Sequence, residues 1–164
     1  MASLFGFGKG KAQNNQPNTL EQEDKGIIGR YYEDEKPVIM KFVNELPDEE
    51  TMNKLPFLTI VSWKYDGSQN NGMPNSEVNQ RMIALEDAIE NSQPKADVFK
   101  HAYSRTGNNL KEFAYYSTSQ DNFMSLLNLT LKNHERYPIE INFYEDKEWA
   151  DFKVVLKDFS NNDN

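Results

Sequence analysis

The sequence predicts an α+β domain in which one antiparallel sheet carries two helices on one face. Three observations predict this class. Several segments alternate apolar and polar residues with the period of a strand, two others repeat apolar residues at helical spacing, and the two kinds of segment alternate along the chain. The 164 residues are enough for one ordinary domain, and 10 Phe, 8 Tyr and 2 Trp can fill its core.

The two ends of the chain are predicted to be disordered. Residues 1–25 are rich in Gly, Asn and Gln without a periodic apolar pattern, and residues 160–164 form a short polar tail. The single folded domain is therefore expected over residues 26–159. The sequence shows no membrane-spanning apolar run and no secretory signal, and its lack of Cys fits a reducing compartment such as the cytoplasm.

The folded part is predicted to begin with a β-hairpin. Residues 26–32 and 37–43 read as strands, and the charged stretch Glu33-Asp34-Glu35-Lys36 supplies the turn between them. Residues 44–55 are expected to be a polar connection. The strongest strand follows at residues 57–65, where large apolar and aromatic side chains alternate between the two faces.

Beyond this strand, helical and strand patterns alternate. A helix is expected from Ser76, a good N-cap residue, because apolar residues follow it at spacings of four, three and four. The other expected elements are strands over residues 97–104 and 110–117 around the turn Thr106-Gly107-Asn108-Asn109, a helix over 120–133, a strand over 139–144 and a short terminal helix over 148–159.

The order of elements from residue 57 is strand, helix, strand, strand, helix, strand. This order is typical of the ferredoxin-like split βαβ arrangement, an antiparallel sheet with two helices on one face. The N-terminal β-hairpin is expected to extend or flank that sheet.

Short signatures along residues 26–156 resemble the bacterial domain-of-unknown-function family 695. They are Tyr32-Glu33-Asp34-Glu35-Lys36-Pro37, Asn71-Gly72-Met73-Pro74-Asn75-Ser76-Glu77, Ala84-Leu85-Glu86-Asp87, Glu112-Phe113-Ala114-Tyr115-Tyr116, Tyr137-Pro138-Ile139-Glu140 and Asp146-Lys147-Glu148-Trp149. One departure is Phe152, where the family tends to place Tyr. The resemblance implies no established activity. Similar domains are sometimes joined to one resembling an acidic inhibitor of ribonuclease E, and they resemble immunity proteins against bacterial toxins, so by analogy the resemblance implies protein binding.

The sequence carries no recognisable catalytic or metal-binding motif. There is no Cys, and His101 and His134 have no Asp or Glu at ligand spacing. Paired carboxylates occur at Glu86-Asp87, Glu145-Asp146 and Glu148 with Asp151, but these pairs are expected on helix faces or turns, where solvated charge is the ordinary role. We therefore expect no enzyme, no cofactor and no metal site.

The formal net charge of −8 belongs to the predicted folded part. Residues 1–25 contain three lysines and three acidic residues, which cancel, so the whole imbalance lies in residues 26–164. An acidic domain repels nucleic acid and attracts a basic protein. A mildly acidic balance that serves solubility alone would give the same charge.

These observations favour a non-enzymatic protein-binding module, most specifically an inhibitor or immunity protein that occludes a basic protein such as a nuclease toxin. Acidic residues would steer the partner, and aromatic side chains would anchor it. Tyr115 and Tyr116 are adjacent and should point to opposite faces, so one of them is expected on an open face, unless the N-terminal hairpin or the terminal helix covers it. The predicted partner-binding residues are Asp48, Glu49, Glu50, Tyr116, Glu145, Asp146, Glu148, Trp149 and Asp151. For Trp149 the alternative is a place in the core.

Three other functions stay open. An aromatic sheet face could stack RNA bases, but the net negative charge and the missing basic-glycine-aromatic signature oppose this. A small-molecule or regulatory domain would need a large closed cavity near Gly72-Met73-Pro74. An enzyme would need a buried carboxylate with a strongly raised pKa in a cleft.

Overall fold

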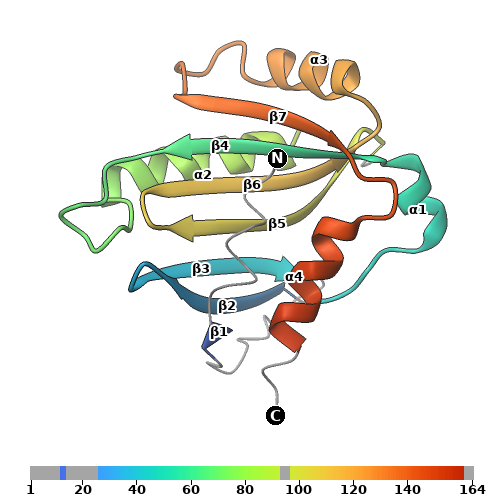
Figure 1. Cartoon of the computed structure of the whole chain (residues 1–164). Helices are drawn as coiled ribbons and strands as arrows, with labels where there is room; N and C mark the ends of the chain where they lie inside the picture. The colour runs from blue at the N-terminus through green and yellow to red at the C-terminus, as the bar shows by residue number, and fades with distance from the viewer. Residues whose placement is uncertain (1–11, 14–25, 93–96, 161–164) are drawn as a thin grey trace.

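An open antiparallel sheet of six long strands, extended by the two-residue β1, forms the frame of the protein (Figure 1). The structure is a computed structural model that describes residues 12–13, 26–92 and 97–160. The strands are β1 (Ala12–Gln13), β2 (Gly26–Glu33), β3 (Lys36–Val43), β4 (Phe57–Lys64), β5 (Phe99–Gly107), β6 (Leu110–Ser117) and β7 (Ile139–Glu145). Most of the residues that were expected to be disordered lie outside the described residues. The exceptions are Ala12 and Gln13, which form β1, and Ser160, which ends α4.

The described residues also contain the four helices α1 (Glu49–Lys54), α2 (Ser76–Glu90), α3 (Gln120–Thr130) and α4 (Ala150–Ser160). The strands lie in the order β1-β2-β3-β5-β6-β4-β7, and every neighbouring pair is antiparallel. The predicted mixture of an antiparallel sheet with helices is therefore confirmed, and the predicted strands occur within a few residues of their expected bounds.

The two hairpins close through two-residue turns. Asp34 and Glu35 have φ of 50° and 63°, and Asn108 and Asn109 have φ of 48° and 67°. Two consecutive left-handed residues form the turn whose twist suits adjacent antiparallel strands. Asn and Asp accept this conformation readily, whereas Glu35 adopts it because the β2–β3 pairing runs without a break to the turn.

Helix α1 lies within residues 44–55, for which the sequence predicts only a polar connection. The Asp48 side chain accepts a 2.7 Å hydrogen bond from the Thr51 backbone N–H, and Glu49 and Glu50 occupy the first turn. Both features stabilise a helix N-terminus. The helix has only 6 residues and none is buried, so it leaves no apolar periodicity in the sequence.

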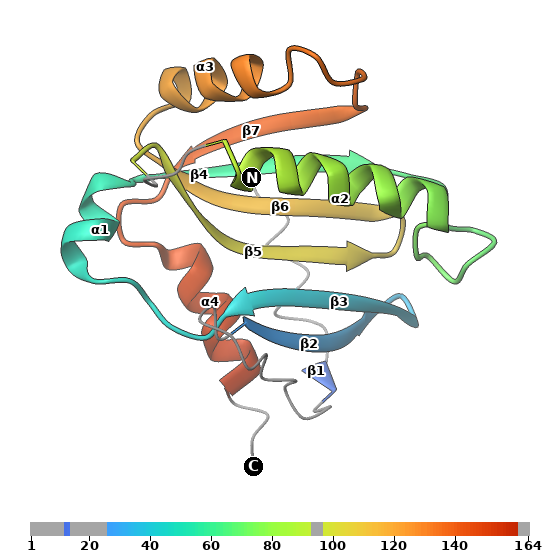
Figure 2. The ribbon, with the colours of Figure 1, turned by 180° about the vertical axis from the view of Figure 1, so that it is seen from behind.

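Helices cover the sheet from both sides. Helices α2 and α3 lie over one face (Figure 2), where Met82, Leu85 and Phe123 pack against Phe113 and Tyr115. Helix α4 crosses the opposite face (Figure 1). Its buried side chains pack in a second core cluster with Trp149, Tyr31, Phe42, Tyr103 and Tyr116.

The far end of α4 sits directly on the N-terminal hairpin. The Phe159 ring lies 5.1 Å from the Phe42 ring, centroid to centroid. A Cβ on Gly29 of β2 would collide with the same Phe159 ring, so the missing side chain is what lets the helix approach the strand.

Candidate functional site

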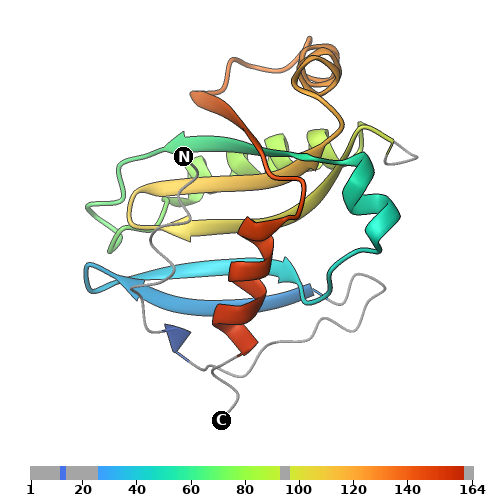
Figure 3. The same ribbon diagram turned by 45° about the vertical axis from the view of Figure 1, so that its right-hand side comes forward.

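Two acidic segments that lie far apart in the sequence meet at one end of the molecule (Figure 3). The first is α1, which directly precedes β4, and the second is the connection between β7 and α4. They meet because β7 pairs with β4, with Phe57 opposite Glu145. The Asp146 backbone N–H donates a 2.8 Å hydrogen bond to the Pro56 carbonyl, and the Trp149 indole N–H donates a 3.0 Å bond to the Leu55 carbonyl.

Five exposed carboxylates define what we call the acidic end: Asp48, Glu49, Glu50, Glu145 and Glu148. The hydrogen bond from Thr51 lowers the pKa of Asp48. Lys54 lies 3.1 Å from Glu50, and Lys147 lies 3.1 Å from Glu145. These ion pairs are largely exposed, so they are weak and their carboxylates can exchange partners.

Asp146 belongs to the same connection, but its carboxylate holds α4 in place. Its Oδ1 accepts a 2.9 Å hydrogen bond from the Ala150 N–H, and its Oδ2 accepts a 3.1 Å bond from the Asp151 N–H. The Tyr116 hydroxyl donates a 2.7 Å bond to the same Oδ2. Asp146 therefore caps the helix and links it to β6.

Asp151 is a buried carboxylate beneath α4. Its side chain is 4% exposed, and its Oδ2 accepts a 2.8 Å hydrogen bond from the Tyr103 hydroxyl. Burial raises the pKa of Asp151 to about 7; the nearby Asp146 and Glu112 raise it further, whereas the Tyr103 hydrogen bond lowers it. Asp151 does not line any of the three pockets described below.

The two predicted aromatic anchors, Tyr116 and Trp149, pack against each other instead of facing solvent. Their rings stack at 3.8 Å with an interplanar angle of 8°, and they are 0% and 1% exposed. Tyr115 is also buried, under α2 and α3. The expectation that one of the adjacent tyrosines lies on an open face is therefore wrong, and the alternative in which the terminal helix covers the ring is the one observed.

Backbone hydrogen bonds tie the Gly72-Met73-Pro74 loop to the β5–β6 turn. The Asn109 N–H donates a 2.9 Å bond to the Gly72 carbonyl, which also accepts a 2.7 Å bond from the Tyr65 hydroxyl. The Gly67 N–H donates a 2.8 Å bond to the Asn109 side chain. None of the three described pockets is lined by this loop, which serves as a brace between two strand connections.

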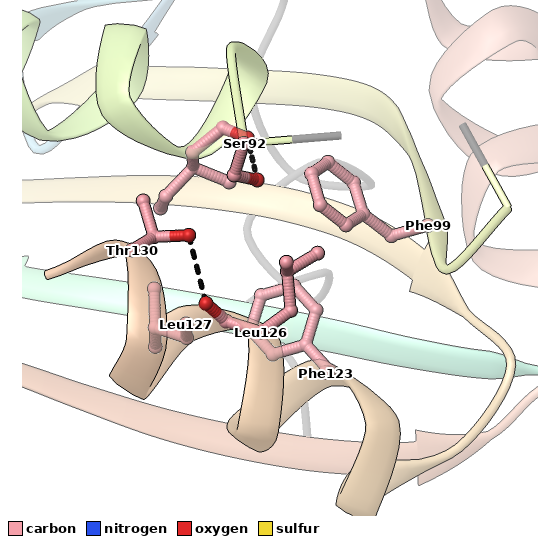
Figure 4. Close-up of a pocket in the computed structure, with 7 residues that line it drawn as sticks. Ser92, Phe99, Phe123, Leu126, Leu127 and Thr130 are labelled. Atoms are coloured by element: carbon pink, nitrogen blue, oxygen red, sulfur yellow. Dashed lines mark hydrogen bonds between the residues drawn. The ribbon is translucent and has the colours of Figure 1, made fainter. Parts of the chain in front are cut away.

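Those three pockets differ in character. One lies between α2 and α3 (Figure 4), where Phe99, Phe123 and Leu127 leave no room for a water molecule, so it is a packing gap. A second, of about 310 Å³, lies at the turn after α3 beside His134. The third, of about 190 Å³, lies between α2 and the β2–β3 hairpin and is lined partly by charged residues.

The two histidines lie outside any metal-binding group. His134 lies beyond the end of α3, and its Nδ1 is 3.1 Å from the Tyr137 hydroxyl. The pKa of His101 is lowered to about 4, first by burial and then by Lys111 and Lys41. Within the described ranges, no three His, Asp or Glu side chains gather closely enough to hold a metal ion.

The described helices are either too short or too polar to cross a membrane. In a comparison with family models, residues 31–156 match the family of unknown function DUF695. No curated protein and no solved structure matches the chain. The family match covers well over half of the sequence and includes the end of β2, all of β3, helices α2 and α3 and most of α4. The chain therefore belongs to the family of unknown function DUF695.

Proposed function

We propose that this protein is a non-enzymatic cytoplasmic module that binds a basic protein at its acidic end. In the most specific form of the proposal, it is an inhibitor or immunity protein that occludes a basic protein such as a nuclease toxin. The observation that carries the proposal is the meeting of α1 and the β7–α4 connection, which places exposed carboxylates from two distant segments on one end of the molecule.

The clustered negative charge of the acidic end is expected to act mainly on the rate of association with a partner. Carboxylates that lie near one another produce a local negative potential that raises the encounter rate with a basic surface, and the effect weakens with salt. The network under the acidic end also fixes its shape, because Asp146, Trp149 and Leu55 lock the two acidic segments together. A fixed surface loses little conformational freedom when it binds.

The buried Asp151 and the partly buried Asp146 are used inside the protein, which supports binding by the exposed acids around them. Asp146 and Asp151, two of the predicted partner-binding residues, hold α4 through hydrogen bonds with β5 and β6 side chains. Tyr116 and Trp149 support the same helix from below. These four residues therefore shape the acidic end from within, and the exposed carboxylates are the groups that a partner would meet.

We also infer that β4 to β7 with α2 and α3 form a ferredoxin-like unit extended by the N-terminal hairpin. The strand order β5-β6-β4-β7 supports this inference, since β4 lies between the third and fourth strands of the unit and pairs antiparallel with both. In this arrangement β3 adds to the sheet beside β5.

The binding proposal is tested by reversing charge at the acidic end. The variant Glu50→Lys, Glu145→Lys, Glu148→Lys leaves the capping residues in place, and the control variant Asp87→Lys, Asp97→Lys, Glu140→Lys changes the same number of exposed acids elsewhere. Both variants have the same net charge. The wild-type protein and the two variants are immobilised, and proteins captured from the native host are quantified by mass spectrometry.

We expect a captured protein of basic isoelectric point that the control variant retains and the acidic-end variant loses. Binding of the purified partner should also weaken with salt, and its association rate should fall at least tenfold in the acidic-end variant. Equal loss in both variants would show only a general charge effect. Equal retention in both variants would reject the acidic end as the binding surface.

A further inference from the structure

The pocket between α2 and the β2–β3 hairpin, which we call the α2 pocket, has an apolar floor and charged walls. Its floor includes Ile28 and Val43. Met40 and Phe42 of β3 point into the core beneath α4, so the alternating residues Lys41 and Val43 point to the face that α2 covers. The pocket is therefore a gap between the helix and the outer part of the sheet.

One wall of the α2 pocket is negative and the facing wall is positive. Glu86 and Glu90 lie one helical turn apart on α2, and Lys41 belongs to the strand opposite. Neither Lys41 nor Glu86 forms an ion pair with any described residue. A cation and an anion thus face the same small space without contacting each other.

Two further residues, a neutral His101 and a buried Lys111, contribute to the charge distribution around the α2 pocket. The His101 ring is 24% exposed, and its Nδ1 lies 4.0 Å from a Glu90 carboxylate oxygen. Its pKa of about 4 leaves it uncharged at neutral pH. Lys111, on the strand beneath α2, donates a 2.7 Å hydrogen bond to Thr106 and interacts favourably with Glu86. Two lysines therefore balance two glutamates around the pocket.

This balance selects the class of ligand. The pocket opens to solvent, because Lys41 and Glu90 are exposed. A simple cation or anion would meet a charge of its own sign on one wall, whereas a molecule that carries both charges would be attracted by both walls. The volume of about 190 Å³ corresponds to about six water molecules, well below the ~300 Å³ at which drug-sized sites begin. We propose that the α2 pocket binds a small zwitterion, a free amino acid, with its ammonium group toward Glu86 and its carboxylate toward Lys41.

The test uses the full chain and the common free L-amino acids at millimolar concentration. Binding is followed by two-dimensional amide NMR, which reports the site as well as the affinity. We expect at least one amino acid to shift the amide signals of Ile28, Lys41 and His101. Its N-acetyl form, which lacks the ammonium charge, and its amide form, which lacks the carboxylate, should each bind about tenfold more weakly.

Two variants locate the contacts. Lys41→Met and Glu86→Gln should each weaken binding about tenfold. The matched controls Lys64→Met and Asp87→Asn remove exposed charges that do not line the pocket and should leave the affinity unchanged. If a pocket variant fails to fold, the N-acetyl and amide forms test the same contacts on the unmodified protein. The absence of pocket shifts with every amino acid, or equal binding of the blocked forms, would overturn the proposal.

Discussion

Adjacent residues can be equally buried and still contribute differently to stability. Tyr115 and Tyr116 are both 0% exposed, but they face opposite sides of β6. The Tyr116 hydroxyl donates to Asp146 and accepts a 3.3 Å hydrogen bond from the Phe152 N–H. The Tyr115 hydroxyl is buried without a hydrogen-bond partner among the described residues.

Replacing each tyrosine by phenylalanine should therefore affect stability differently. Tyr116→Phe leaves Asp146 and the Phe152 N–H without the hydroxyl, and we expect it to lower the free energy of unfolding by about 1–2 kcal/mol. Tyr115→Phe removes an unsatisfied polar atom and should be neutral or stabilising. Urea unfolding of the two variants checks the pair, and equal destabilisation would contradict it.

Asp151 should make stability depend on pH. Its pKa of about 7 in the folded protein exceeds the ordinary value of about 3.9, so between these values the folded state binds more protons than the unfolded state. Stability should fall as pH rises through this window and remain lower above it. Tyr103, Tyr116, Asp146 and Glu112 surround the carboxyl and fix its environment.

Asp151→Asn should remove that dependence. Relative to the wild-type protein, the variant should gain about 1–3 kcal/mol of stability between about pH 5 and about pH 8. Urea unfolding across this range gives the difference, and Asp87→Asn on exposed helix surface serves as the control. A constant difference between Asp151→Asn and the wild-type protein at all pH values would show that the buried carboxyl does not titrate in this window.

At the scale of elements, two aspartates begin two helices at the acidic end. Asp48 caps the short α1, which has no fully buried residue, whereas Asp146 caps α4, whose first turn includes the buried Asp151 and Phe152. The difference in burial means that the same kind of cap supports a surface feature in one case and a core element in the other.

Removing each cap should loosen a different helix. Asp146→Ala leaves two helix N–H groups and the Tyr116 hydroxyl without their acceptor, and we expect it to cost about 1–3 kcal/mol and to speed hydrogen exchange in residues 150–152. Asp48→Ala should speed exchange only in α1. Hydrogen exchange read by mass spectrometry separates the two, and faster exchange throughout the chain in both variants would contradict this division.

Local patterns in the sequence predicted the elements well but not how they cover one another. Strand alternation places Tyr115 and Tyr116 on opposite faces, as observed, because it follows from backbone geometry. The burial of Tyr116 depends on where α4 docks, which is a long-range contact without a local signal. For the same reason, the acidic pattern suggested Asp146 and Asp151 as surface residues, although one caps α4 and the other lies beneath it.

For the candidate site, the sequence predicts exposure where it follows from local pattern, whereas the binding role of these residues stays a prediction. Asp48, Glu49, Glu50, Glu145 and Glu148 are exposed, as clustered charged residues usually are. Their meeting at one end depends on the pairing of β4 with β7. The α2 pocket left no signal, because Lys41, Glu86 and His101 come from three elements whose proximity only the fold creates.

At the scale of the whole molecule, the strand order has a consequence for the time course of folding. Strand β3 pairs with β5 and not with the next strand along the chain, β4. Strand β4 pairs with β6 and β7, which come later in the sequence. Most of the sheet therefore forms between segments distant in the chain, which is typical of domains that fold in milliseconds to seconds.

Helix α4 can dock only when β2, β5 and β6 are in place, so its docking should be the last step of folding. With Trp63→Phe leaving Trp149 as the remaining indole, stopped-flow fluorescence should report that last event. On a ribosome, this domain would stay incompletely folded until α4 has emerged.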